Sequence, residues 1–291
     1  MKAQGRERSG APLQDEDALP ATITHQAPHS ADQRSEVIDY FEKNDYAAFW
    51  DERRIEDAAQ KYLLRRWVDT GGAVVELGGG FGRIAKVLES RFGTSVLVDL
   101  SNRNIGVARG YLARTNIAKS DVASTPFRDS TFDCVVMMRV IHLLTNPLAV
   151  FREIERIAKD GATVVVSIPN QALISAFMGF AKLSRLGRNR RGEDAFIPSP
   201  WPYKNGSYLL APMDMFPPSF KLTGRKGTGI FENPIGRRLS RFKLLYLIEA
   251  ATFPLWMFKF EILLRFEVRK EHRGANGAMS KRASKGPHTR A

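Results

Sequence analysis

Four glycines within five positions are the part of the sequence that points most directly to chemistry. They are Gly78, Gly79, Gly80 and Gly82. They follow a short apolar run, residues 73–77, that contains Glu76. Glycine admits positive φ angles and lets a ligand approach the backbone, and a following helix N-terminus offers free N–H groups. We therefore expect a cofactor loop at the carboxyl end of a strand.

Three classes of cofactor use such a loop, and the flanking residues separate them in part. A nucleoside-triphosphate loop ends in Gly-Lys-Ser/Thr, whereas Gly82 is followed by Arg83 and Ile84, which excludes that class. The dinucleotide pattern G-x-G-x-x-G/A is satisfied by residues 80–85, so this class stays open on the glycines alone. Residues 76–82 also fit the pattern acidic-x-Gly-x-Gly-x-Gly.

Further polar residues follow at the ends of later apolar runs. Asp99 closes the run "SVLVDL", and Asp121 stands in "SDV" shortly before Pro126 and Phe127. The stretch "FDCVVMM" at residues 132–138 leads directly into "RVIHLL", which begins with Arg139 and contains a histidine.

In this order, the motifs resemble those of the class I S-adenosylmethionine-dependent methyltransferases. The resemblance extends from about residue 73 to residue 168, a third of the chain. It implies an α/β fold with a doubly wound, Rossmann-like, mostly parallel seven-stranded sheet, an N-terminal helical cap and an insertion after strand 5. It also implies S-adenosyl-L-methionine as cofactor, a sulfonium that has no phosphate and needs no P-loop lysine.

The resemblance assigns a role to each matching position at the amino-acid and ribose end of the cofactor. The backbone of Gly78, Gly80 and Gly82 should pack against this portion. Glu76 should lie beneath it, and Asp99 should accept both ribose hydroxyls, a task for a carboxylate with two oxygens.

Other matching positions should contact the rest of the cofactor. Leu100 should contact the adenine face, Asp121 and Val122 the adenine edge, and Arg139 the methionine end. His142 is the candidate catalytic residue. Structural alternatives stay open for most of these positions. They are Asp99 as a helix cap, Asp121 as a turn carboxylate, Glu76 as an acceptor for loop amides, Arg139 paired with a surface acid and His142 as a structural histidine.

Alternating apolar patterns predict the elements that position these residues. Strands are expected over residues 73–77, 95–100, 117–122, 132–138 and 162–168, with helices over 83–92, 104–114 and 147–158. Short buried strands that alternate with helices are typical of a doubly wound parallel sheet. An apolar helix is expected at 244–258, with core packing favoured over docking on a membrane, and a last strand at 261–268.

The predicted domain organisation has six parts. Residues 1–33 form a disordered tail, 34–70 a helical cap, 71–170 the cofactor-binding core, 171–235 an insertion or substrate region, 236–271 the C-terminal part of the core and 272–291 a disordered basic tail. Aromatic side chains of the cap and of the insertion are candidates to line the acceptor pocket, as follows: Tyr40, Phe41, Tyr46, Phe49, Trp50, Trp201, Tyr203, Phe216 and Phe220.

Composition narrows the class of partner without naming it. A hydrophobic content of 43% excludes a wholly disordered chain, and the net charge of +13 indicates either an anionic partner or solvated basic segments. We expect a small-molecule, apolar or lipid-like methyl acceptor. The alternatives are an RNA or protein methyltransferase that uses the basic surface, and a non-catalytic cofactor-binding protein. Peripheral membrane contact stays open.

The single cysteine, Cys134, rules out an intrachain disulfide and fits a reducing compartment. The first residues lack the apolar region of a secretory signal, and residues 244–264 are interrupted by charges and a proline. We therefore expect a cytoplasmic protein without a transmembrane segment. The patterns show no metal site.

Overall fold

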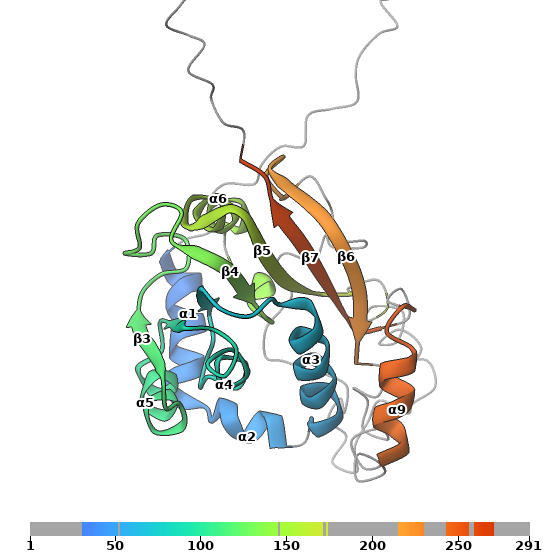
Figure 1. The fold of residues 1–291 in the computed structure, drawn as a ribbon. Coiled ribbons are helices and arrows are strands. Elements are labelled where there is room, and N and C mark those ends of the chain that lie inside the picture. The colour runs from blue at the N-terminus through green and yellow to red at the C-terminus, as the bar shows by residue number, and fades with distance from the viewer. Residues whose placement is uncertain are drawn as a thin grey trace, which may run out of the picture.

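The computed structural model describes residues 31–51, 53–144, 146–170, 173, 215–229, 243–255 and 259–270. Its centre is a seven-stranded sheet in the order β3-β2-β1-β4-β5-β7-β6. The strands from β1 to β5 are parallel, and β7 runs antiparallel to both β5 and β6. This is the predicted doubly wound, mostly parallel α/β architecture (Figure 1).

The elements have the following bounds. The strands are β1 (Ala73–Leu77), β2 (Thr94–Asp99), β3 (Thr115–Lys119), β4 (Phe132–Met137), β5 (Ala158–Pro169), β6 (Phe220–Thr228) and β7 (Glu261–Val268). The helices are α1 (Ala31–Lys43), α2 (Tyr46–Asp51), α3 (Arg54–Trp67), α4 (Ala85–Leu88), α5 (Asn102–Tyr111), the short 3-10 helix η1 (Ile141–Leu143), α6 (Pro147–Ile157) and α9 (Lys243–Ala251).

The central strands bury both of their faces. In β4, Val135 and Met137 join a core with α6, whereas Cys134 and Val136 join a second core with α3 and α4. Successive side chains of a strand point to opposite faces, so this alternation places an apolar layer on each side of the sheet. The two layers hold the carboxyl ends of β1, β2, β3 and β4 at one edge.

The N-terminal helices lie next to this edge. The range predicted as a cap, residues 34–70, holds most of α1 together with α2 and α3. In Figure 1, α9 stands beside α3, and Phe253 of the turn after α9 belongs to the same buried cluster as Leu63 and Leu64 of α3. The cap therefore touches both the parallel strands and the C-terminal part of the chain.

Several predicted boundaries differ from the structure. The helix expected over residues 83–92 is a single turn, α4, which begins at Ala85, after the positive φ of 89° at Gly82, and ends at Leu88. The third strand ends at Lys119 instead of residue 122, and α9 ends at Ala251 instead of residue 258. The fifth strand begins four residues early, at Ala158.

The largest difference concerns the predicted insertion at residues 171–235. β6 lies inside this range but pairs with β7 along the core sheet, so the insertion ends before Phe220. Phe216 and Phe220 pack against Phe151 and Phe266 in the core and do not line the pocket described below. These two aromatics were therefore predicted wrongly.

Some sequence predictions fall outside the described residues. These are both tails, residues 1–30 and 271–291, and the aromatics Trp201 and Tyr203. Within the described part of the chain, no helix combines the length and the apolar character that crossing a membrane requires.

Candidate functional site

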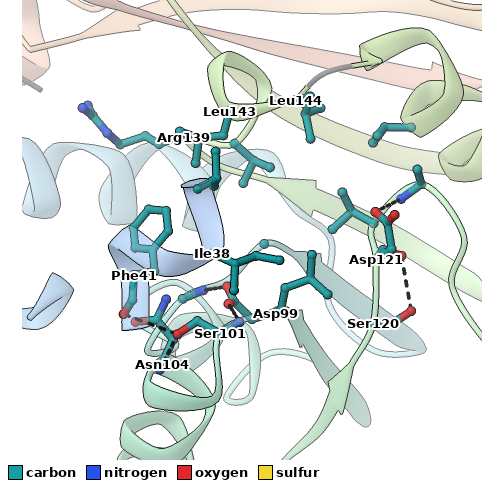
Figure 2. Close-up of a pocket in the computed structure, with 18 of the residues that line it drawn as sticks. Ile38, Phe41, Asp99, Ser101, Asn104, Ser120, Asp121, Arg139, Leu143 and Leu144 are labelled. Carbon is teal, nitrogen blue, oxygen red and sulfur yellow. Dashed lines mark hydrogen bonds between the residues drawn. The ribbon is translucent and has the colours of Figure 1, made fainter. Parts of the chain in front are cut away.

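A pocket lies at the carboxyl ends of the parallel strands, between them and α1 (Figure 2). Loops after β1, β2, β3 and β4 supply most of its wall. Among its lining residues are seven that the sequence singled out: Gly78, Gly80, Asp99, Leu100, Asp121, Val122 and Arg139. The topological switch of the sheet, where β1 lies between β2 and β4, stands at this place, as in other open α/β folds.

The glycine loop is fixed to the neighbouring strand by its backbone. The N–H groups of Gly78 and Gly79 both donate to the carbonyl of Val98, at 2.8 Å and 3.1 Å. Gly80 has a φ of 58°, and a Cβ atom there would stand 3.0 Å from the Tyr46 ring. Glycine is needed at this position because the left-handed backbone and the close approach of α2 both disfavour a side chain.

Asp99 connects this loop to the next helix. Its Oδ2 accepts a hydrogen bond from Gly80 N–H at 2.7 Å, and its Oδ1 accepts one from Ser101 N–H at 2.9 Å. Burial raises the pKa of Asp99 even though these hydrogen bonds oppose the shift. Ser101 also caps α5, because its Oγ accepts from Asn104 N–H at 3.1 Å. The carboxylate therefore has a fixed orientation at the base of the pocket.

Glu76 lies beneath the loop and is not among the lining residues. Its side chain is buried, and among the described residues no hydrogen-bond partner reaches its Oε2. Burial raises the pKa of this carboxyl to about 8, although the charge of Arg83 opposes the shift. A Cβ atom on Gly79 would lie 2.9 Å from its Cδ, so the loop rests directly on this carboxyl group. Gly82 likewise stands outside the lining residues.

Asp121 and Val122 form the opposite side of the pocket. Figure 2 shows Ser120 and Asp121 across the pocket from Phe41 and Asn104. Oδ1 of Asp121 accepts from the N–H of Ala123 at 3.0 Å, which stiffens the turn after β3. Asp121 is thus a turn carboxylate and a lining residue at once.

Arg139 follows β4 in a left-handed conformation, with a φ of 59°. Its N–H donates to Ser167 Oγ at 2.7 Å, which holds this unusual backbone. The guanidinium points away from Asp121 and forms ion pairs with Glu56, at 2.6 Å, and with Glu261, at 3.0 Å (Figure 2). The alternative was a pair with a surface acid, whereas the structure pairs Arg139 with two buried acids and still places it in the lining of the pocket.

The ion pairs of Arg139 belong to a larger buried network on α3. Glu56 also pairs with Arg53 at 3.1 Å, and Gln60 donates to Glu261 at 2.6 Å. Burial alone would raise the pKa of Glu56, but the charges of Arg139, Arg53 and Arg83 outweigh it and lower the pKa. Arg83, directly after the glycine loop, stacks 3.4 Å over the Trp50 ring. The cap is thus joined electrostatically to the edge of the sheet.

His142 lies on η1 and does not contribute to the pocket wall. Burial, with a further contribution from the charge of Arg139, lowers the pKa of its imidazole to about 3. A ring with so low a pKa is a weak base at neutral pH. The structure therefore places the candidate catalytic histidine in a structural position.

Several lining residues were not expected. They come from α1, from α6 and from the polypeptide after β2, β3 and β4: Val37, Ile38, Ser101, Asn104, Ser120, Ala123, Val140, Leu143, Leu144, Asn146 and Val150. Phe41 and Tyr46, named as aromatics of the cap, are present. Ser101 carries a readable signal, since a serine directly before a helical pattern is a preferred N-cap. The apolar residues of α1 carry no sequence signal that distinguishes the wall of a pocket from core packing.

Comparison with known proteins agrees with this geometry. Residues 75–166 match the family model of the methyltransferase domain. This part of the chain is a class I S-adenosylmethionine-dependent methyltransferase domain. The matched residues run from β1 to β5 and carry the glycine loop, Asp99, Asp121 and Arg139.

The methyltransferase domain also has relatives of known name. The ubiquinone/menaquinone biosynthesis C-methyltransferase UbiE of Xylella fastidiosa (strain M23) is 29% identical over 186 residues, which cover 59% of this chain and 70% of that protein. A SAM-dependent methyltransferase of Thermotoga maritima has a similar fold, with a TM-score of 0.55, 20% identity and coverage of 80% and 99% of the two chains. Geranyl diphosphate C-methyltransferase of Streptomyces coelicolor gives a TM-score of 0.50 with 13% identity over 84% and 100%.

The residues of the site fit the cofactor of this family. The methionine end of S-adenosylmethionine carries a positive ammonium group. Glu76 does not line the pocket, but directly beneath the glycine loop its buried Oε2 is an acceptor without a partner among the described residues. Gly78 and Gly80 have no side chains, which leaves room for a ligand to approach their backbone closely, and Asp99 is a lining residue of the same pocket. Among the described residues, no group of acidic, histidine or cysteine side chains could hold a metal ion.

Proposed function

We propose that this methyltransferase acts on a small, apolar and uncharged acceptor. The observation that supports the proposal is the composition of the wall beyond the polar base of the pocket. This part of the pocket is lined by apolar side chains from α1, from η1 with its two flanking residues, and from α6. They are Val37, Ile38, Phe41, Val140, Leu143, Leu144 and Val150. Pockets with such walls and few polar groups are typical of small-molecule sites.

The charges of the pocket support an uncharged acceptor. Arg139 is the single cationic side chain among its described lining residues. Two carboxylates, Glu56 and Glu261, already neutralise its guanidinium. Among the described lining residues, the pocket therefore offers an anionic acceptor no cation that is not already paired with carboxylates.

Each residue would then have a defined task in the reaction. When bound, S-adenosylmethionine supplies a methyl group on a sulfonium, which is open to in-line displacement. Asp99 would hold the ribose hydroxyls, Asp121 and Val122 the adenine, and Gly78 and Gly80 would admit the amino-acid end. The fixed walls would align the acceptor atom with the methyl group, and alignment of this kind accounts for much of the acceleration in such reactions.

The named relatives agree with a small-molecule acceptor. UbiE is named as a C-methyltransferase of ubiquinone and menaquinone biosynthesis. Methylation of RNA or of protein would require a macromolecule to reach the strand ends beneath α1. The described residues show a pocket walled by α1 at that place, and the basic clusters of the chain fall mostly outside these residues.

Two measurements test the proposal. Titration calorimetry should detect binding of S-adenosylmethionine to the folded protein, and absence of binding would refute the cofactor assignment. Tritiated methyl transfer into a cell extract should then label the lipid or small-molecule fraction. Label in RNA or in protein would overturn the acceptor class, and cofactor binding with no label in any fraction would identify a non-catalytic protein.

A further inference from the structure

Large apolar side chains are exposed together on α9 and on the neighbouring side of α3. Among the described residues, Leu247 is 68% exposed, Leu255 54%, Tyr62 45% and Ile248 37%. The Tyr62 ring lies 6.1 Å from the ring of Phe253, in the turn that leads from α9 to Leu255. We call these four exposed residues the α9 surface. The other exposed large apolar side chains among the described residues are Val107 and Tyr111, one turn apart on α5, Leu148 on α6 and Leu222 on β6.

The inner side of α9 explains why its apolar side chains face outward. Glu249, the single acid of the helix, is fully buried and pairs with the fully buried Lys259 at 3.0 Å. The N–H of Gly229 also donates to Glu249 at 2.8 Å. The helix thus buries a charged pair, which carries a desolvation cost, while it exposes leucine and isoleucine to solvent. This inverted arrangement is typical of a surface that another apolar phase covers.

The charge around the α9 surface selects the partner. Arg65 and Arg66 are exposed on α3. Arg66 donates to the Tyr62 hydroxyl at 3.0 Å, with its guanidinium 5.5 Å from the ring centre. In the sequence, Arg237, Arg238 and Arg241 directly precede the helix, and the whole chain has a net charge of +13. Apolar side chains bordered by cations match the interfacial region of an anionic bilayer.

The α9 surface lies at the same edge of the sheet as the pocket. After α9 the chain enters β7 at Glu261, which pairs with Pro169 at the carboxyl end of β5. Glu261 in turn pairs with Arg139, which lines the pocket. A membrane on the α9 surface would therefore lie at the same end of the strands as the pocket.

We propose that the α9 surface docks on anionic lipid membranes as a peripheral contact. Leu247, Ile248 and Leu255 insert at the level of the headgroups, and Arg65 and Arg66 contact lipid phosphates. The docking itself does not depend on the identity of the methyl acceptor. A further step, that the methyl acceptor is dissolved in the membrane, rests on the proposed function.

Vesicle co-sedimentation of the full chain tests the proposal. The wild type should bind vesicles of phosphatidylcholine mixed with phosphatidylglycerol better than pure phosphatidylcholine, with affinity that falls as salt rises. Leu247→Glu should weaken binding at least tenfold, because a buried leucine contributes that much or more and a carboxylate is repelled. Arg65→Gln and Arg66→Gln should each weaken it about fivefold. Val107→Glu on α5, 43% exposed in the wild type, is the matched control and should leave binding unchanged.

Three outcomes would overturn the proposal. They are no vesicle binding by the wild type, equal binding by Leu247→Glu and Val107→Glu, and a wild-type dimer in light scattering that Leu247→Glu dissociates. Equal binding by the two glutamate variants would assign vesicle binding to other basic segments. A dimer that Leu247→Glu dissociates would show that the α9 surface binds a second copy of the chain. Leu247→Ser replaces Leu247→Glu if the charged variant does not fold. Calorimetry with S-adenosylmethionine, run on the same samples, reports separately on the proposed function.

Discussion

The guanidinium of Arg139 donates from Nη1 to Oε1 of Glu56 at 2.6 Å, which joins the end of β4 to the cap helix α3. The two residues are 83 positions apart in the sequence, and both side chains are largely buried. The contact makes one residue of the pocket wall depend on a helix outside the methyltransferase family match. Its loss should therefore affect both stability and the shape of the pocket.

Glu56→Gln should lower the free energy of unfolding by about 3–5 kcal/mol, because it takes one carboxylate away from two buried guanidinium groups, that of Arg53 and that of Arg139, which keeps Glu261. Urea denaturation at neutral pH measures this change. Asp129→Asn is the matched control, since Asp129 pairs with Arg156 at 2.7 Å but is 76% exposed. Its effect should stay below about 1 kcal/mol. Equal effects of the two variants would contradict a structural role for the network.

Asp99→Asn should weaken the binding of S-adenosylmethionine at least tenfold. Both carboxylate oxygens accept backbone N–H groups, from Gly80 and from Ser101, so either orientation of an asparagine sets its NH₂ group against a donor. The orientation needed to hold a ribose would be lost together with the charge. Titration calorimetry measures the affinity, with Asp129→Asn expected to bind as the wild type does. An unchanged affinity in Asp99→Asn would refute the ribose assignment.

Glu76→Gln should stabilise the protein increasingly as the pH rises from about 5 to 8. The pKa of Glu76 is about 8 in the folded state against a usual value of 4.5, so over this interval the folded state holds a proton that the unfolded state has lost. The contribution of Glu76 to stability then falls by up to about 1.4 kcal/mol per pH unit in the wild type. Urea denaturation of both proteins across this range gives the difference. Two parallel curves would show that Glu76 ionises normally.

The sequence predicted the parts of the site that are encoded locally. Glycine spacing, the acid at the end of an apolar run and the alternation of strands and helices are each visible within about ten residues, and they placed Gly78, Gly80, Asp99 and Asp121 at one pocket. Such local signals are reliable because the carboxyl ends of parallel strands share one edge.

Relations between distant segments were not predictable in the same way. The pairing of Arg139 with Glu261 spans 122 positions, and nothing near either residue indicates it. The positive φ of Arg139 also lacks a signal, because arginine has no preference for that conformation. For the same reason, Phe220 could be recognised as apolar but not as part of a strand that completes the sheet.

His142→Gln should leave the rate of methyl transfer and its pH dependence unchanged. With a pKa of about 3 the ring stays neutral over the working range, and it does not line the pocket. A general base would instead produce a limb in the pH–rate profile that disappears in the variant. The wild type should also lose stability as the pH falls from about 6.5, where the unfolded state binds a proton that the folded ring does not, and His142→Gln should lack this loss.

Glu42→Gln should speed the dissociation of S-adenosylmethionine by loosening α1 over the pocket. Oε1 of Glu42 accepts the N–H of Asn102 at 2.5 Å and Oε2 that of Arg103 at 3.2 Å, so the carboxylate fastens α1 to the N-terminus of α5. A negative charge at that end of a helix contributes about 0.3–1 kcal/mol, which predicts a rise in the dissociation rate of about two- to fivefold. Asp39→Asn is the control on the same helix, because Asp39 pairs only locally with Lys43 and both side chains are exposed. Stopped-flow measurement of cofactor release compares the two variants. Equal rates for Glu42→Gln and the wild type would show that this contact does not hold α1 over the bound cofactor.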